Sequence, residues 1–304
     1  MTDRKAALSS HALECLREAG RIAAAVRKLG AGLIRPGASL REVCEAVEDE
    51  IRRRGAGAAF PAQTSRNQVA AHYCPGIDED TTYEDGDVAK LDIGVHVDGW
   101  VVDTALTVNV GDRPEHRRLI EAARAALDAA VEFIRPDTGV RALSTRIEQT
   151  IRSFGLQPVR NLCGHGVGRW TVHCPPPIPN VADATSDRVA VGAVVAIEPF
   201  ATDGRGMVTE RGQAEVFRLD PGRDRGRLGH PDVLEAIRGL NGLPFARRQL
   251  AHLPHVAVES TLKELTRSGA LMAYPPLVET TGRPVAQAEH TVYVGVKGVE
   301  VLTR

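Results

Sequence analysis

This 304-residue sequence lacks the features typical of a membrane protein, a secreted protein or a strongly basic nucleic-acid-binding protein. No apolar stretch approaches the roughly 18 residues that a membrane-spanning helix needs. Residues 1–28 mix charged residues with alanine and lack the continuous apolar core of a signal peptide. The net charge is only −1, with 38 Lys and Arg against 39 Asp and Glu, which argues against a strongly basic nucleic-acid binder. We therefore expect a soluble cytoplasmic protein with no membrane partner and no specific nucleic-acid partner.

Cysteine is also scarce, and its spacing argues against a disulfide framework. The number is odd, no C-x-x-C pair occurs, and the chain is long, so a reducing compartment is expected. The rest of the composition, 43% hydrophobic and 25% charged, is that of a globular protein with a sizeable core. The five cysteines are Cys15, Cys44, Cys74, Cys163 and Cys174.

An internal repeat organises the sequence. Ile34-Arg35-Pro36 recurs at 134–136, and the apolar, acidic, basic and glycine positions of 47–55 recur at 147–155, always at an offset of 100. Each copy predicts an alanine-rich helix that ends near Leu33 or Phe133, a turn, and a second helix closed by glycine.

The repeat extends into two apolar strand patterns, 86–92 and 192–198, each of which starts with glycine and ends with an acid. Two halves of helix, helix and sheet, related by an approximate two-fold axis, would place Asp92 and Glu198 at equivalent positions near that axis. The sequence therefore predicts an α+β fold with two pseudo-symmetric halves in a single domain of residues 1–304.

Residues 223–274 do not follow the repeat, and we expect them to form a helical insertion in the second half. Helical patterns cover Pro231–Leu240, Pro244–Leu253 and Ser260–Ser268. A solvated face explains the arginines of this segment better than nucleic-acid binding does, because acidic residues lie among them. These arginines are Arg223, Arg225, Arg227, Arg247 and Arg248.

Two aspartates are expected to share one face of a β-hairpin. Asp98-Gly99 between apolar residues is a strong signal for a two-residue type I′ turn. Pairing outward from that turn places Asp92 opposite Ala105. The same register places Asp103 opposite Gly94, which leaves room beside the aspartate. The two carboxylates then project from the same side as diagonal neighbours, roughly 7–8 Å apart.

This carboxylate pair has two interpretations. A solvated face is the simpler one. However, apolar residues flank both aspartates, and two close carboxylates in a buried setting would leave one of them protonated unless a cation intervened. A divalent ion between Asp92 and Asp103 would remove the conflict.

Three further residues are candidates for the same chemistry. His165 lies between glycines in Gly-His-Gly, Glu198 ends an apolar strand pattern, and Glu289 lies within Ala-Glu-His-Thr. Taken singly, the histidine could be structural and each glutamate could face water at a strand end. Together with the aspartates they form an oxygen-rich set with one nitrogen, compatible with Mn, Fe, Co or Zn. Four carboxylates also balance the charge of two divalent ions.

In this order and in these local contexts, the five residues resemble the metal ligands of the type II methionine aminopeptidases, metallopeptidases of the pita-bread (creatinase/aminopeptidase-like) fold. The gap of 91 residues between Glu198 and Glu289 holds the predicted insertion, which separates type II from type I. The short region before Asp92 resembles the archaeal form. Further matching segments are 59–61, 71–73, 161–162, 178–180 and 243–247.

The resemblance implies a dinuclear centre that removes the N-terminal methionine of nascent polypeptides. Asp103 and Glu289 would bridge two divalent ions (Co, Mn, Fe or Zn), Asp92 would complete one ion, and His165 with Glu198 the other. The ions would make hydroxide available near neutral pH for attack on the scissile carbonyl. Glu198 would also pass a proton to the leaving amine. Proximity to the ribosome and a monomeric state are further expectations.

Three other residues match substrate-contacting positions of that family. His72 and His173 match its two non-ligand histidines, which would hydrogen-bond the substrate backbone and the developing oxyanion. Phe60 matches a residue that lines the methionine pocket, although by itself it would be assigned to the core. Asp98 is assigned to the turn.

Two alternatives from the same fold remain. Xaa-Pro aminopeptidases and dipeptidases use similar ligands, but they normally carry a large additional N-terminal domain, for which no room exists before Asp92. Non-catalytic pita-bread proteins bind partners and would be expected to lose ligands, whereas all five are present here.

Overall fold

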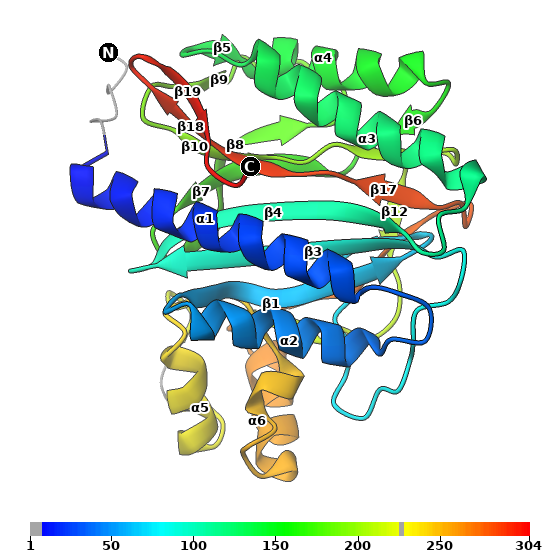
Figure 1. Ribbon diagram of the computed structural model, residues 1–304. Helices are drawn as coiled ribbons and strands as arrows, with labels where there is room; N and C mark the ends of the chain where they lie inside the picture. The colour runs from blue at the N-terminus through cyan, green and yellow to red at the C-terminus, as the bar shows by residue number, and fades with distance from the viewer. Residues whose placement is uncertain (1–7, 225–227) are drawn as a thin grey trace.

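Helices pack outside a set of antiparallel sheets (Figure 1). The computed structural model describes residues 8–224 and 228–304. No helix within those ranges is both long enough and apolar enough to cross a membrane. The helices are α1 (Ser10–Leu33), α2 (Leu40–Arg53), α3 (Pro114–Phe133), α4 (Val140–Ser153), α5 (Pro231–Arg238) and α6 (His255–Arg267), with the 3-10 helix η1 (Arg247–Leu250).

The strands are short except for those of the first sheet and β8. They are β1 (Gly57–Arg66), β2 (Val69–Ala71), β3 (Val88–Val97), β4 (Trp100–Asn109), β5 (Thr138–Gly139), β6 (Gln157–Pro158), β7 (Cys163–Gly168), β8 (Thr171–Pro179), β9 (Arg188–Val189), β10 (Val194–Ile197), β11 (Phe200–Thr202), β12 (Val208–Glu210), β13 (Val216–Leu219), β14 (Phe245–Ala246), β15 (Leu271–Tyr274), β16 (Leu277–Glu279), β17 (Val285–Gln287), β18 (His290–Gly295) and β19 (Gly298–Val301).

The internal repeat is a structural repeat. Helices α1 and α3 end at Leu33 and Phe133, and α2 and α4 cover residues 40–53 and 140–153, so the offset of 100 is kept. Gly55 and Gly155, which follow the second helix of each copy, have φ of +80° and +71°, a conformation that favours glycine. The predicted duplication of the helical units is therefore confirmed.

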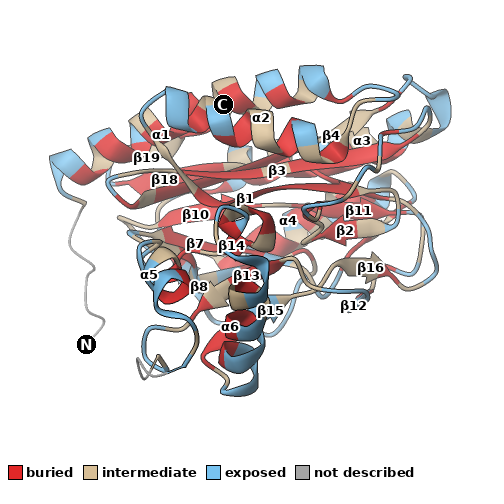
Figure 2. Cartoon of the chain, turned by 90° about the horizontal axis from the view of Figure 1, so that it is seen from below, coloured by how far each residue is buried: buried red, intermediate tan, exposed pale blue. Residues whose placement is uncertain are grey.

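Each helix pair covers its own sheet and core. Apolar residues of α1 and α2 pack on the sheet β1-β3-β4, whereas those of α3 and α4 pack on strands that include β10 and β18. The second half also contains the sheet β19-β18-β10-β7-β8. Figure 2 shows the result: strand β3 is mostly red, while α1 and α2 are red on their inner faces and pale blue outside. This arrangement confirms the predicted α+β fold with two pseudo-symmetric halves.

A smaller unit projects from this body, with α5 and α6 at the bottom of Figure 1. Its helices lie between β13 and β15, which pair with each other, and it has an apolar core of its own. The predicted helix over Pro244–Leu253 is wrong: this segment forms β14 and η1, because Phe245-Ala246 pairs with β13. Helix α6 also begins at His255, ahead of the predicted Ser260.

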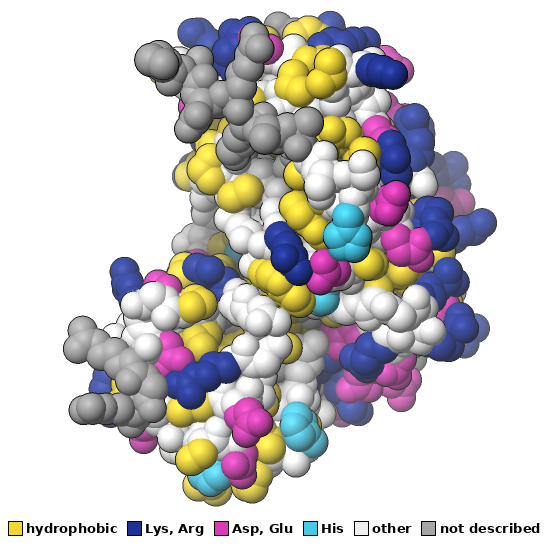
Figure 3. Space-filling model, turned by 90° about the vertical axis from the view of Figure 1, so that its left-hand side faces the viewer, with side chains coloured by type: hydrophobic (Ala, Val, Ile, Leu, Met, Phe, Trp, Pro, Cys, Tyr) yellow, Lys and Arg dark blue, Asp and Glu magenta, His cyan; other side chains and the backbone are white. Residues whose placement is uncertain are grey.

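Arginines of this unit differ in their surroundings. Arg223 forms an exposed ion pair with Asp220, at 3.4 Å, as a solvated face predicts. Arg248 is instead buried against Glu48, so a solvated face is wrong for Arg248. Arg225 and Arg227 lie outside the described residues. On the face drawn in Figure 3, Lys and Arg side chains lie among Asp and Glu side chains.

Candidate metal centre and substrate cavity

The β3–β4 hairpin positions two of the candidate ligands. Its turn residues Asp98 and Gly99 have φ of +49° and +80°, as a type I′ turn requires. Asp92 pairs with Ala105, and Asp103 pairs with Gly94. The predicted register is therefore confirmed, and both carboxylates lie on the same face of the hairpin.

The room at Gly94 is used by a neighbouring strand. A Cβ at Gly94 would lie 2.3 Å from Cε1 of Phe60, so the phenyl ring of β1 sits directly against this glycine. Phe60 and Asp103 both line a cavity that is described below. Glycine at position 94 is therefore required by the close approach of the ring.

Long-range strand pairing places His165 beside Glu198. Ala196 on β10 pairs with His165 on β7, and Glu198 follows two residues later. His165 Nε2 lies 3.5 Å from Glu198 Oε1 and 3.7 Å from Asp103 Oδ2.

Hydrogen bonds hold the segment around Glu289 against the hairpin. The Glu289 amide donates to the Ala105 carbonyl at 3.0 Å. The Thr291 hydroxyl donates to the carbonyl of Asp103 at 2.7 Å and accepts from the amide of Asp103 at the same distance. One ligand-type atom each from Asp103, His165 and Glu289 lies within 4.8 Å of the others, and all three residues are buried.

The donor set fits divalent cations, because several of its buried oxygens lack a partner. Asp92 Oδ1, Asp103 Oδ1 and both carboxylate oxygens of Glu289 make no hydrogen bond with any described residue. A buried, unpartnered carboxylate is costly unless it is protonated or bound to a cation. Four carboxylates and one imidazole are suitable ligands for Zn, Mn, Fe or Co.

Burial and mutual repulsion dominate the electrostatics of this cluster. Burial raises the pKa of Asp92 to about 6. Burial, followed by the charges of neighbouring carboxylates, raises the pKa values of Asp103, Glu198 and Glu289 well above their usual range. Burial lowers the pKa of His165 to about 3, with a smaller contribution from His173. The imidazole therefore keeps a lone pair available for a cation.

Sequence reasoning missed Gln287, which links two of the candidates. Its amide Nε2 donates to Asp92 Oδ2 at 3.3 Å and to Glu198 Oε2 at 3.2 Å. Gln287 ends β17, two residues before Glu289. The alternation of side chains in an extended chain could have identified Gln287, since it places residues 287 and 289 on one face.

Two further histidines lie at the same cavity. The ring centroids of His165 and His173 are 4.2 Å apart, and the ring planes are inclined at 64°. His72 lies edge-on to Tyr274 at 5.6 Å, and its amide donates to Gln63 Oε1 at 2.8 Å. His72 has φ of +66°, a strained conformation for this residue type that occurs preferentially at functional sites. Burial lowers the pKa of His72 to about 4 and also lowers that of His173, so both rings are neutral near pH 7.

The cavity above the candidate ligands has a volume of about 460 Å³. Apolar side chains form much of its wall, and Asp92, Asp103, His165 and Glu198 are among its polar lining residues. Cys163 and Cys174 also line it. The apolar lining includes Phe60, Leu162, Val172, Phe200, Val216 and Leu277.

Gly164→Ala is expected to lower kcat/KM roughly 10²-fold for the hydrolytic activity that the family resemblance implies, since a shift of about 1 Å in a catalytic group has that order of effect. A Cβ at Gly164 would lie 2.3 Å from the backbone oxygen of Ala196, so β7 must move away from β10 and carry His165 with it. Gly168→Ala is the matched control, because its Cβ would meet Thr171 Cβ at an ordinary 3.8 Å. Steady-state kinetics of both variants test this, and equal rates would contradict it.

Comparison with known proteins gives a consistent result. Residues 14–238 match Metallopeptidase family M24. Methionine aminopeptidase from Archaeoglobus fulgidus is 40% identical over 292 residues, which cover 96% of this chain and 98% of that protein.

Solved structures show the same fold at lower sequence identity. Methionine aminopeptidase from Thermotoga maritima has a TM-score of 0.73 at 22% identity, and the match covers all of both chains. Prolidase from Pyrococcus furiosus has a TM-score of 0.64 at 18% identity, with 97% of this chain but 64% of that chain covered. The rest of the prolidase chain lies outside the match.

Proposed function

The chain belongs to metallopeptidase family M24, and we propose that it removes the N-terminal methionine from peptides by metal-dependent hydrolysis. One observation carries this proposal: Asp92 and Asp103, whose buried Oδ1 atoms lack partners, line a largely apolar cavity. Identity of 40% to an archaeal methionine aminopeptidase, over nearly all of both chains, supports the same activity.

The proposed ligands are the five residues of the cluster. Asp92, Asp103, His165, Glu198 and Glu289 would together hold two divalent ions. The unpartnered oxygens of Asp92, Asp103 and Glu289 support this assignment. The chemistry that such ions supply when bound is Lewis acidity, which lowers the pKa of water and polarises a carbonyl group.

The protein's own residues provide proton transfer and stabilisation of the oxyanion. The Glu198 carboxylate faces the cavity and accepts a hydrogen bond from Gln287, which fixes its orientation while it accepts a proton and returns it to the leaving amine. His72 and His173 are neutral near pH 7 because burial lowers their pKa values. Each ring therefore keeps one N–H, which would donate to the substrate backbone or to the developing oxyanion.

The cavity also accounts for selection of an N-terminal methionine. Its apolar wall, with the Phe60 ring, suits an unbranched thioether, and sulfur makes favourable contacts with aromatic rings. A free α-amine, which occurs only at a chain terminus, would be a further ligand for an ion held by the carboxylates of the cluster. Because newly made chains begin with methionine, we propose nascent polypeptides as the substrates. The enzyme would be a monomer that acts in the cytoplasm, near the ribosome.

Xaa-Pro peptidase activity is the second candidate, since the prolidase fold is shared. Hydrolysis of Met-Ala-Ser and of Xaa-Pro peptides should be measured with EDTA and after addition of Co, Mn, Fe or Zn. We expect only Met-Ala-Ser to be cleaved, only with metal. Cleavage of the proline peptides alone would favour the second candidate, and full activity in EDTA would reject metal dependence.

Iodoacetamide is expected to inactivate the enzyme through Cys163, which is exposed and lines the cavity. Burial raises the pKa of both the Cys163 and the Cys74 thiols, but Cys74 is also only 3% exposed, and its pKa of about 11 leaves little thiolate below pH 9. Peptide mapping at pH 8.5 should find Cys163 alkylated before Cys74. The Cys163→Ser variant should have the same rate before and after iodoacetamide treatment. Equal inactivation of the variant and the unmodified protein would contradict this prediction.

A further inference from the structure

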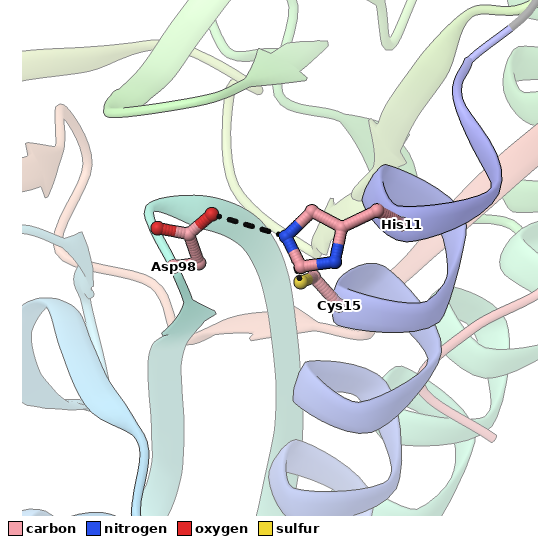
Figure 4. Close-up of side chains that lie close together, drawn as sticks. All are labelled: His11, Cys15 and Asp98. Atoms are coloured by element: carbon pink, nitrogen blue, oxygen red, sulfur yellow. Dashed lines mark hydrogen bonds and ion pairs between the residues drawn. The ribbon is translucent and has the colours of Figure 1, made fainter.

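A second cluster of ligand-type side chains lies at the start of α1, away from the five residues discussed above. His11 and Cys15 are four residues apart on this helix and therefore share a face. Asp98, in the β3–β4 turn, approaches them from the opposite side (Figure 4). One ligand atom of each residue lies within 4.8 Å of the other two.

The distances between these atoms match a tetrahedral zinc site. His11 Nε2 is 3.3 Å from Asp98 Oδ2 and 3.6 Å from Cys15 Sγ. Zinc bonds of about 2.0–2.2 Å to nitrogen or oxygen and about 2.3 Å to sulfur, at tetrahedral angles, separate N from O by about 3.3–3.5 Å and N from S by about 3.5–3.6 Å. The two distances from His11 Nε2 therefore match this geometry, and the sulfur of Cys15 lies within 4.8 Å of the Asp98 carboxylate.

Ordinary hydrogen bonding satisfies this cluster poorly. Both close contacts of His11 involve the same ring nitrogen, Nε2. A nitrogen that carries a proton can donate to Asp98 but cannot accept from the Cys15 thiol, and a nitrogen without a proton can do only the reverse. A cation at the point where the three atoms converge would be attracted by all of them.

The surrounding structure holds the ligands in place. Arg169 donates to Asp98 Oδ1 at 2.8 Å and to the Asp98 carbonyl at 2.9 Å, which leaves Oδ2 directed at His11. Ser9 caps α1, since its hydroxyl accepts from the amide of Ala12 at 3.1 Å. Cys15 is only 6% exposed, so its neighbours restrict the side chain. Outer contacts that orient a ligand in this way are typical of metal sites.

We propose that His11, Cys15 and Asp98 form a zinc(II) site that fastens the start of α1 to the β3–β4 turn. The combination of thiolate, imidazole and carboxylate favours Zn²⁺ over Mg²⁺ or Ca²⁺. Binding replaces the thiol S–H bond with a Zn–S bond, and the proton is released to solvent. The fourth position faces solvent, because the His11 side chain is 70% exposed and that of Asp98 is 45% exposed. The site shares no residue with the proposed peptidase centre.

Cobalt(II) is a suitable probe, because a Co–thiolate bond gives a near-ultraviolet charge-transfer band that carboxylate and imidazole ligands do not give. Reduced full-length protein should be titrated with Co²⁺ without oxygen. We expect a band whose intensity saturates when one Co²⁺ ion per chain is bound at this site. The band should disappear when Zn²⁺ is added, and it should be absent from Cys15→Ser and His11→Ala. Arg169→Gln should weaken Co²⁺ binding roughly 10-fold or more, as loss of an orienting contact does.

Two controls separate this site from the peptidase centre. His252→Ala removes an exposed histidine elsewhere and should keep the band. Cys163→Ser/Cys174→Ser removes the thiols at the cavity and should also keep it. Because His11 is exposed, His11→Ala should fold normally and hydrolyse Met-Ala-Ser at the unchanged rate. The Co²⁺ band is measured without any substrate, so this test of the zinc site does not depend on the proposed peptidase function. Absence of the band from the unmodified protein, or its persistence in Cys15→Ser, would overturn the proposal.

Discussion

Replacement of Glu198 with glutamine is expected to lower kcat for Met-Ala-Ser hydrolysis by roughly 10²–10⁴, the range seen when a general acid–base group is lost. The Glu198 side chain is only 13% exposed and lies 3.5 Å from His165 Nε2. Glutamine keeps its size and can still accept from Gln287, whose amide lies 3.2 Å away. What it removes is the charge and the ability to carry a proton. The effect should therefore fall mainly on kcat, with a smaller change in KM.

The same substitution should have the opposite effect on the stability of the metal-free protein. Removing one of four clustered carboxylates reduces their repulsion, so Glu198→Gln should unfold at a higher temperature in EDTA, a trade-off between stability and activity. It should also bind Mn²⁺ or Co²⁺ more weakly, as measured by equilibrium dialysis. Glu210→Gln, on an exposed position of β12, is the control for both measurements. Unchanged kcat with a full complement of metal would remove Glu198 from proton transfer.

The part of the site that could be predicted from residues alone is the part that depends on local geometry. Asp92 and Asp103 belong to one hairpin, whose register is fixed by a two-residue turn, and the alternation of side chains then fixes their face. The helical repeat was accessible for a similar reason. Helix ends and glycine positions recur at a constant offset, so each copy supports the interpretation of the other.

The convergence of the other candidates depends on pairing between distant strands. His165 comes next to Glu198 only because β7 pairs with β10, and Glu289 approaches the hairpin only because Thr291 binds the backbone of Asp103. No periodicity within a window of ten residues contains this information. Resemblance to a known family supplied the grouping, whereas Gln287, outside the motifs quoted for that resemblance, was missed.

Tertiary contacts also explain the error at Pro244–Leu253. Its apolar spacing fits a helix, but Phe245-Ala246 joins β13, and Arg248 reaches across to α2. Arg248 donates to Glu48 Oε2 at 2.9 Å and to Oε1 at 2.5 Å, and the Ala62 amide donates to Oε1 at 2.9 Å. This buried pair connects the projecting unit to the first half, beside β1, which carries Phe60.

Arg248→Met is therefore expected to lower the free energy of unfolding by about 3–5 kcal/mol, the usual cost of removing one partner of a buried ion pair. Glu48 and Arg248 are 2% and 8% exposed, so the substitution would leave the Glu48 carboxylate buried without a counter-charge. Urea denaturation in EDTA, where bound metal does not contribute, measures the effect. KM for Met-Ala-Ser should also rise, because Val216 and Pro244 of the projecting unit line the cavity.

The duplicated half of the chain supplies a matched control for this prediction. Glu148 lies 100 residues after Glu48 and pairs with Arg152 at 2.9 Å, but that pair is partly exposed, with 23% and 45% of the two side chains accessible. Arg152→Met should therefore cost only about 0–1 kcal/mol. Adding Glu48→Met to Arg248→Met should recover much of the lost stability, because no buried charge then remains, apart from the hydrogen bond that the Ala62 amide loses. A double variant as unstable as the sum of two single losses would show that the ion pair contributes no coupling between the two parts of the fold.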